Sequence, residues 1–224
     1  MADRWINRPE RVVVLAGVAA ALHVGKLSPA LPLLQEQFGF SLLEAGFLLS
    51  LVQLAGMLLG LLVGLTADSL GLRRCVLAGL MLLTVASLAG GASTSLGALL
   101  AWRGAEGVGF LLVCMPAPAL VRRIVPANRV RPALGWWGAY MPAGTALALL
   151  GGTWILQSES WRFWWWVLAA VSLALCAVVA FAVPPDPIAA SQDTPMDAAP
   201  GGAADQPLEW VRRLRRTLSS PGPW

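Results

Sequence analysis

A charged turn interrupts the apolar sequence, and it reads Gly64-Leu65-Thr66-Ala67-Asp68-Ser69-Leu70-Gly71-Leu72-Arg73-Arg74. The apolar runs on both sides of it are long enough to cross a bilayer as helices. Gly64 lets the end of the helix before the turn approach its neighbour closely, and Gly71 permits a tight reversal of the chain. Asp68 is an acceptor suited to a helix N-terminus or an arginine. Arg73 and Arg74 suit the anionic headgroups of the inner leaflet, so the stretch predicts a turn at a membrane surface.

The composition agrees with a protein dissolved in a bilayer. Of the 224 residues, 57% are hydrophobic and only 12% are charged, whereas soluble domains carry about 25% charged residues. This composition excludes an ordinary cytosolic enzyme and a disordered chain. The formal net charge is +4, but the basic residues lie between apolar runs rather than on one soluble face. We therefore expect no nucleic acid partner.

Six apolar runs are long enough to form spanning helices. Their approximate ranges are 11–34, 43–65, 75–93, 96–121, 132–156 and 161–183. Short connections make successive helices antiparallel neighbours. The sequence thus predicts an all-α membrane protein with a six-helix transmembrane bundle over residues 1–183.

The basic residues predict the orientation of these helices. Arg162 is expected on the outer side, and Lys26 and Arg103 fall inside helices. The others share the cytoplasmic side when the N-terminus is inside: Arg4, Arg8, Arg11, Arg73, Arg74, Arg122, Arg123, Arg129, Arg131, Arg212, Arg213, Arg215 and Arg216. This bias predicts a multi-pass membrane protein with both termini cytoplasmic. The Ala-, Leu- and Arg-rich composition suits the bacterial inner (plasma) membrane. The alternative, a cleaved secretory signal near residues 12–22, is disfavoured because the apolar run resumes through Leu34.

The segment after the sixth run, residues 184–224, has a different character. Residues 184–207 are rich in Pro, Ala, Gly and Asp and predict a flexible cytoplasmic linker. Residues 208–218 place Trp210, Val211, Leu214 and Leu218 at helical spacing among four arginines. This short segment is either an amphipathic helix on the anionic leaflet or a solvated basic tail.

Glycines and prolines recur inside the expected helices. Small residues at spacings of about four predict close helix packing in the second, fourth and fifth helices; examples are Gly56, Gly60, Gly64, Gly104, Gly135, Gly144, Ala148 and Gly152. Each proline removes a backbone donor and leaves a carbonyl to be satisfied; these are Pro29, Pro32, Pro116, Pro118 and Pro142. The prolines are either packing kinks or part of a solute-lined cavity.

The charged turn resembles the signature loop of the major facilitator superfamily, G-x-x-x-D-[RK]-x-G-x-[RK]-[RK], in which Ser69 replaces the usual basic residue. Residues 103–109, Arg-Gly-Ala-Glu-Gly-Val-Gly, resemble the R-x-x-x-G-x-G motif of the fourth helix in that family. Three further stretches are similar to the cyanate/nitroimidazole permease-type branch: HVGKLSPALP (23–32), GWWGAYMPAG (135–144) and SWRFWWW (160–166).

The resemblance implies the N-terminal six-helix half of a secondary carrier that moves a small solute by alternating access. The chain would then be a truncated product, a fragment, or a half that needs a second half or a homodimer. The alternative function is that of a transport-inactive six-helix scaffold or interaction module. The expected partners are the lipid bilayer and a small-molecule solute. A gradient would drive transport, so no nucleotide is expected to supply the energy.

Ionisable residues inside spans are candidates for function. His23 and Lys26 share a face of the first helix, and Arg103 and Glu106 share one of the fourth. Lys26 and Arg103 are proposed to contact an anionic or polar solute, with Glu106 as charge partner or proton site. His23 is a further solute-binding candidate or a proton relay. The alternatives are that Lys26 and Arg103 snorkel outward, that Arg103 pairs structurally with Glu106, and that His23 is simply packed.

Aromatic residues gather in the last two expected helices. Tyr140, the only tyrosine, is a candidate solute-binding residue or a core residue. Four tryptophans at the start of the sixth helix predict an interfacial belt; they are Trp161, Trp164, Trp165 and Trp166.

Catalytic and metal motifs are missing from the sequence. The single histidine and three scattered cysteines (Cys75, Cys114 and Cys176) suit neither a metal site nor a disulfide framework. No H-x-E, G-x-S-x-G or P-loop motif is present. We therefore expect neither an enzyme nor a cofactor.

Overall fold

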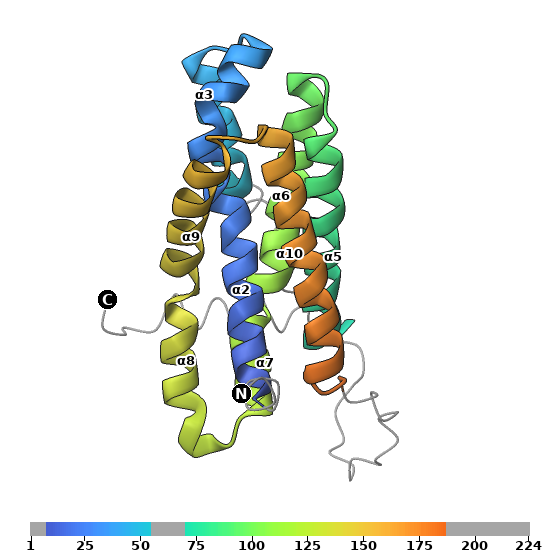
Figure 1. Ribbon diagram of the computed structural model, residues 1–224. Helices are drawn as coiled ribbons and strands as arrows, with labels where there is room; N and C mark the ends of the chain where they lie inside the picture. The colour runs from blue at the N-terminus through green and yellow to red at the C-terminus, as the bar shows by residue number, and fades with distance from the viewer. Residues whose placement is uncertain (1–7, 55–69, 187–224) are drawn as a thin grey trace, which may run out of the picture. The chain divides into compact units, whose positions relative to one another are not determined.

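The computed structural model describes residues 8–54 and 70–186, and every regular element in these ranges is a helix (Figure 1). The elements are α2 (Pro9–Gly25), α3 (Leu27–Phe38), a helix Leu42–Leu54, α5 (Leu72–Gly91), α6 (Leu96–Cys114), α7 (Ala117–Ile124), the 3₁₀ turn η1 (Ala127–Arg129), α8 (Val130–Gly138), α9 (Tyr140–Ile155) and α10 (Trp161–Ala182). These helices belong to one compact unit that ends at Asp186. Gly56, Gly60, Gly64 and Asp68, and the segments expected to form the linker and basic tail beyond residue 186, lie outside the described residues.

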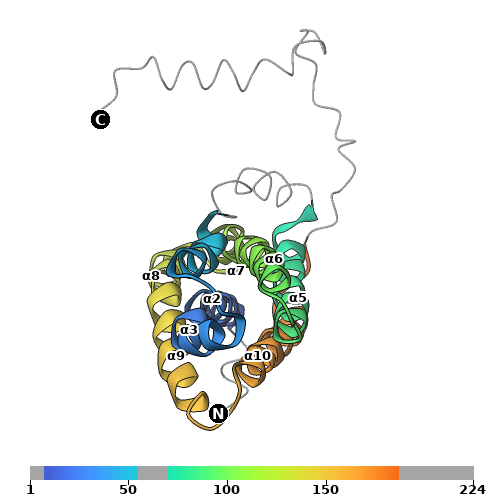
Figure 2. The same ribbon diagram turned by 90° about the horizontal axis from the view of Figure 1, so that it is seen from above.

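The helix α2 lies in the middle of this unit. It packs against α9 on one side and against α10, α6 and α7 on the others, as the view from above shows (Figure 2). Helix α5 packs along α6 and α10. Because neighbours surround it, α2 buries side chains around most of its circumference, including Val12, Val13, Ala16, Ala20 and His23. His23 is therefore placed inside the protein rather than toward lipid.

Prolines divide three of the expected spans at predictable positions. A proline removes the hydrogen bond to the carbonyl four residues earlier and clashes with it. The carbonyl four residues before Pro29 belongs to Gly25, where α2 ends. The equivalent residues are Cys114 for Pro118 and Gly138 for Pro142, where α6 and α8 end. Pro32 instead lies inside α3 without dividing it. Each of the spans expected over 11–34, 96–121 and 132–156 is thus divided by a proline into two helical segments.

Close packing between α2 and α9 depends on Gly144. A Cβ atom on Gly144 would lie 2.5 Å from the Cβ of Ala21 and 2.6 Å from the carbonyl oxygen of Val18, too close for any side chain. Gly79 and Gly109 allow a similar approach of α5 and α6, because a Cβ on Gly79 would lie 2.7 Å from the carbonyl oxygen of Gly109. Such contacts are the usual means by which helices associate in lipid.

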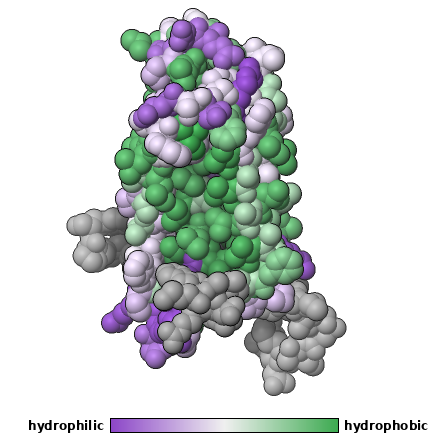
Figure 3. Space-filling view, in the orientation of Figure 1, coloured by the Kyte–Doolittle hydropathy of each residue, from purple (hydrophilic) through white to green (hydrophobic). Residues whose placement is uncertain are grey.

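The face of the molecule drawn in Figure 3 carries a broad apolar zone between two more polar ends. Within the described residues, four helical stretches are long and apolar enough to cross a membrane: Pro9–Phe38, Leu72–Gly91, Leu96–Ile124 and Trp161–Ala182. The second expected span is described only as the shorter apolar helix Leu42–Leu54, and the fifth is divided into α8 and α9. The all-helical, apolar character predicted from the sequence is confirmed, whereas six crossings and cytoplasmic termini stay predictions.

Candidate functional site: a buried charge cluster

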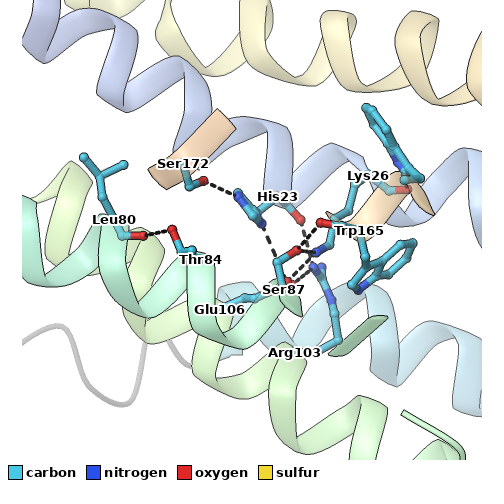
Figure 4. A network of polar contacts seen from close by, with 10 residues as sticks. His23, Lys26, Leu80, Thr84, Ser87, Arg103, Glu106, Trp165 and Ser172 are labelled. Carbon is cyan, nitrogen blue, oxygen red and sulfur yellow. Dashed lines mark hydrogen bonds and ion pairs between the residues drawn. The ribbon is translucent and has the colours of Figure 1, made fainter. Parts of the chain in front are cut away.

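Four ionisable residues meet inside the helices, and we call His23, Lys26, Arg103 and Glu106 the charge cluster (Figure 4). His23 lies in the last turns of α2, and Lys26 occupies the break between α2 and α3. Arg103 and Glu106 lie one turn apart on α6. All four are buried, with exposed fractions of 0% for Lys26 and 1% for the others. Burial of charge at this level requires mutual pairing.

Glu106 is the centre of the charge cluster. Its Oε1 accepts a hydrogen bond from Lys26 Nζ, and its Oε2 accepts one from Arg103 Nη1 at 2.5 Å. His23 Nδ1 lies 3.6 Å from Oε1, beyond hydrogen-bond distance. With His23 neutral, two cations face one carboxylate, so the cluster carries an excess of positive charge.

Neutral groups from other helices complete the network. Lys26 Nζ also donates to Ser87 Oγ at 2.7 Å, and this hydroxyl donates to the Trp165 carbonyl at 3.0 Å. The Lys26 ammonium lies 4.4 Å from the centroid of a Trp165 ring, within cation–π range. His23 Nε2 lies 2.7 Å from Ser172 Oγ. The network therefore joins α2 to α5, α6 and α10.

Arg103 keeps unused donors in this buried position. Its Nη1 also donates to the His23 carbonyl at 2.8 Å, but its Nε and Nη2 have no hydrogen-bond partner among the described residues. His23 Nδ1 is likewise without one there. A buried guanidinium offers these N–H groups in a fixed planar geometry that matches carboxylate and phosphate oxygens.

The structure resolves several alternatives for the four charged residues. The expected structural pair of Arg103 with Glu106 is confirmed. The alternative that Lys26 and Arg103 snorkel outward is wrong, because neither side chain reaches the surface. Sequence reasoning missed the contact of Lys26 with Glu106 and the parts played by Ser87 and Ser172. The only sequence signal for Ser87 and Ser172 was the presence of a hydroxyl side chain inside an apolar span.

Tyr140 lies outside the charge cluster, and Trp164 contacts it through the Lys26 backbone. Tyr140 stacks on Trp137, with ring centroids 4.3 Å apart, and its hydroxyl contacts the Cys114 thiol. The interfacial belt is wrong for three of four tryptophans, because Trp161, Trp164 and Trp165 are buried. Trp164 Nε1 instead donates to the Lys26 carbonyl at 3.2 Å, beside the proline-induced break.

The described part of the signature loop begins α5 and is held by Asp186. Gly71 precedes α5 with φ of +94°, a conformation that favours glycine. The Asp186 carboxylate accepts hydrogen bonds from the backbone N–H of Arg73 at 3.1 Å and of Arg74 at 3.0 Å. Arg123 Nη1 lies 2.7 Å from Asp186 Oδ1. Partial burial raises the pKa of Asp186, but these hydrogen bonds and the Arg123 charge outweigh it and hold the pKa below its ordinary value.

The fold and the charge cluster are those of a polytopic membrane protein that buries its charges between helices. The chain belongs to the Major Facilitator Superfamily, whose sequence profile matches residues 13–223. Membership of this family and the apolar helices make the chain part of a membrane-embedded protein in a family of transporters.

Similar proteins and structures agree with this family. The uncharacterized MFS-type transporter Rv1877 of Mycobacterium tuberculosis is 30% identical over 77% of this chain and 25% of its own length. The puromycin resistance protein pur8 of Streptomyces alboniger is 32% identical over 72% of this chain and 32% of its own. The structure of the proton:xylose symporter XylE superposes with a TM-score of 0.72 at 14% identity, over 83% of this chain and 46% of that one.

A bacterial homologue of the lysosomal transporter Spinster superposes with a TM-score of 0.67 at 14% identity, over 97% of this chain and 50% of that one. The chain thus spans between a quarter and a half of the length of these proteins. At these identities the structural matches show the shared fold alone.

Proposed function

We propose that this chain is the N-terminal six-helix half of a secondary carrier for a small anionic solute. The carrier would expose the solute site alternately to the two sides of the membrane as its halves rock against each other. A solute or ion gradient would supply the energy. The solute-binding residues would be Lys26 and Arg103, with Glu106 as the carboxylate that leaves them or takes a proton when the solute binds.

The observation that carries this proposal is the excess positive charge of the charge cluster. Lys26 and Arg103 share one carboxylate, and Arg103 Nε and Nη2 lack partners among the described residues. A solute carboxylate or phosphate would satisfy these donors and balance the second cation. Ionisable groups are costly at membrane depth, and such groups commonly mark a solute or ion pathway.

The coverage of the similar proteins supports the half-carrier form. The structural match to the Spinster homologue takes in 97% of this chain but 50% of the other. We extend the proposal to six crossings, both termini in the cytoplasm and an inner-membrane location, as the distribution of arginines indicates. The second half would come from further sequence of the same protein, from a separate chain or from a second copy of this one.

A transport-inactive scaffold is the competing function, and one observation favours it. Each charged group of the charge cluster already has a charged partner within the chain, and the side chains are no more than 1% exposed. A cluster with this pairing could serve only to fix how α2 and α6 pack. The two functions differ in whether changes at Lys26 and Arg103 affect transport or stability alone.

Uptake by the complete carrier tests the proposal. The downstream reading frame would identify that carrier if it encodes six further apolar helices, and crosslinking would identify a homodimer. A panel of labelled small organic anions would be offered to proteoliposomes under an imposed proton gradient. We expect Lys26→Gln and Arg103→Gln to abolish uptake, while Arg122→Gln, an exposed arginine elsewhere on the chain, leaves it unchanged. Normal transport by both cluster variants would contradict the proposal.

A further inference from the structure

A pocket of about 300 Å³ lies at the opposite part of α2 from the charge cluster, beside its first turns. Its lining comes from the start of α2, from Val125 after α7, and from the start of α8. Both α2 and α8 begin at the same end of the bundle, the lower end in Figure 1. The pocket is therefore at a rim of the apolar zone rather than in its centre.

The entrance of this rim pocket is basic. Three arginines line it, Arg8, Arg11 and Arg129, together with the single acid Glu10. Arg8 and Arg129 are exposed. The formal charge of the lining is thus positive, and arginine forms two parallel hydrogen bonds to the oxygens of one phosphate group.

The inner part of the rim pocket is apolar. Val14 and Leu15 lie about two turns beyond Arg8 on α2, and Ala133 and Trp136 lie one to two turns beyond Arg129 on α8. A rise of about 1.5 Å per residue places Leu15 and Trp136 both roughly 10 Å deeper than these arginines. Leu15 is 47% exposed and Trp136 is 73% exposed. The basic entrance thus continues into an apolar wall that opens sideways.

We propose that the rim pocket binds an anionic phospholipid, with its phosphate at Arg8, Arg11 and Arg129 and an acyl chain along Leu15 and Trp136. The charge of the entrance selects an anion. The open apolar wall favours a lipid over a free anion, because a free anion has no acyl chain to pack against it. A tryptophan at the rim also suits the boundary between headgroups and acyl chains. The site is distinct from the charge cluster and is independent of the proposed transport function.

Native mass spectrometry of the full chain, purified in a mild detergent, tests this site. The protein would be incubated with phosphatidylglycerol or with phosphatidylcholine of the same acyl chains, and the retained lipid counted. We expect wild type to retain phosphatidylglycerol preferentially and Arg8→Gln and Arg129→Gln each to lower its retention about fivefold. The matched control is Arg131→Gln, an exposed arginine two residues after Arg129 that does not line the pocket, which should behave as wild type.

A second comparison separates a lipid from a free anion. Trp136→Ala should weaken binding of long-chain phosphatidylglycerol more than binding of its short-chain analogue. Millimolar inorganic phosphate should not displace the long-chain lipid. Circular dichroism and the unfolding temperature establish that each variant is folded. Equal phosphatidylglycerol retention by wild type and the arginine variants, or displacement of the lipid by phosphate, would overturn the proposal.

Discussion

Glu106→Gln is the substitution to which the charge cluster should be most sensitive. It leaves Lys26 and Arg103 buried side by side, with exposed fractions of 0% and 1%, and no carboxylate between them. Removing one partner of a buried ion pair costs about 3–5 kcal/mol. We expect a loss of this size in the free energy of unfolding, because two uncompensated cations are worse than one.

Lys26→Met provides the contrast. It keeps the pair of Arg103 with Glu106 and removes the excess positive charge, at the cost of the Lys26 hydrogen bonds to Glu106 and Ser87 and of the Trp165 ring contact. The Ser87 and Trp165 interactions together are worth about 1–3 kcal/mol. Glu106 keeps Arg103 as its cation, and removal of the excess charge offsets part of the total cost. We therefore expect Lys26→Met to cost less than Glu106→Gln. The double variant should be more stable than Glu106→Gln alone, because it leaves one unpaired cation instead of two.

Unfolding by SDS titration in mixed micelles, followed by circular dichroism, measures these free energies. The variants to compare are wild type, both single variants and the double variant. A cost below about 1 kcal/mol for Glu106→Gln would refute the reasoning. A double variant less stable than Glu106→Gln alone would refute it as well, because the repulsion between the two cations would then be negligible.

Two further predictions concern packing and the signature loop. Gly144→Ala should cost about 1–3 kcal/mol by overpacking α9 against α2, since its Cβ would lie 2.5 Å from that of Ala21; Gly138→Ala, where nothing lies within 4 Å, is the control. An unfolding temperature for Gly144→Ala equal to that of Gly138→Ala would contradict the close approach. Asp186→Asn should remove about 1–2 kcal/mol, as loss of a helix N-cap does. Because its pKa is lowered in the folded protein, Asp186 stabilises fully above its unfolded pKa and less as pH falls through the folded one. The unfolding temperature of Asp186→Asn should therefore fall less than that of wild type on acidification, with the exposed Glu159→Gln as control; parallel curves for Asp186→Asn and wild type would argue against the contact.

The sequence was most informative where the physical rule is local. Arg103 and Glu106 are one helical turn apart, so their pairing could be predicted from spacing alone. The proline rule is equally local, and it places the breaks at Gly25, Cys114 and Gly138 when Pro29, Pro118 and Pro142 are counted back four residues. Pro32, inside α3, is an exception. The apolar runs predicted helices because their length and composition are also local properties of the sequence.

Contacts between distant helices could not be predicted in this way. The pairing of Lys26 with Glu106 depends on how α2 and α6 pack, which no spacing within either helix encodes. The burial of the tryptophans of α10 likewise depends on contacts with other helices. Their position at a helix start predicts an interfacial belt, but α10 turns Trp164 and Trp165 inward, where they contact Lys26. A lysine placed at a proline-induced break, near free carbonyls, was the signal that could have suggested a buried role.

Binding of small anions to the purified carrier is the most direct test that the charge cluster is a solute site. The measurement is the shift in unfolding temperature on adding each anion of the transport panel, for wild type and for Lys26→Met. This variant is chosen because Arg103 and Glu106 remain paired in it. We predict that at least one anion stabilises wild type and that Lys26→Met, folded but without the second cation, shows no such shift. An equal shift in both proteins would contradict the assignment of Lys26 to the solute site.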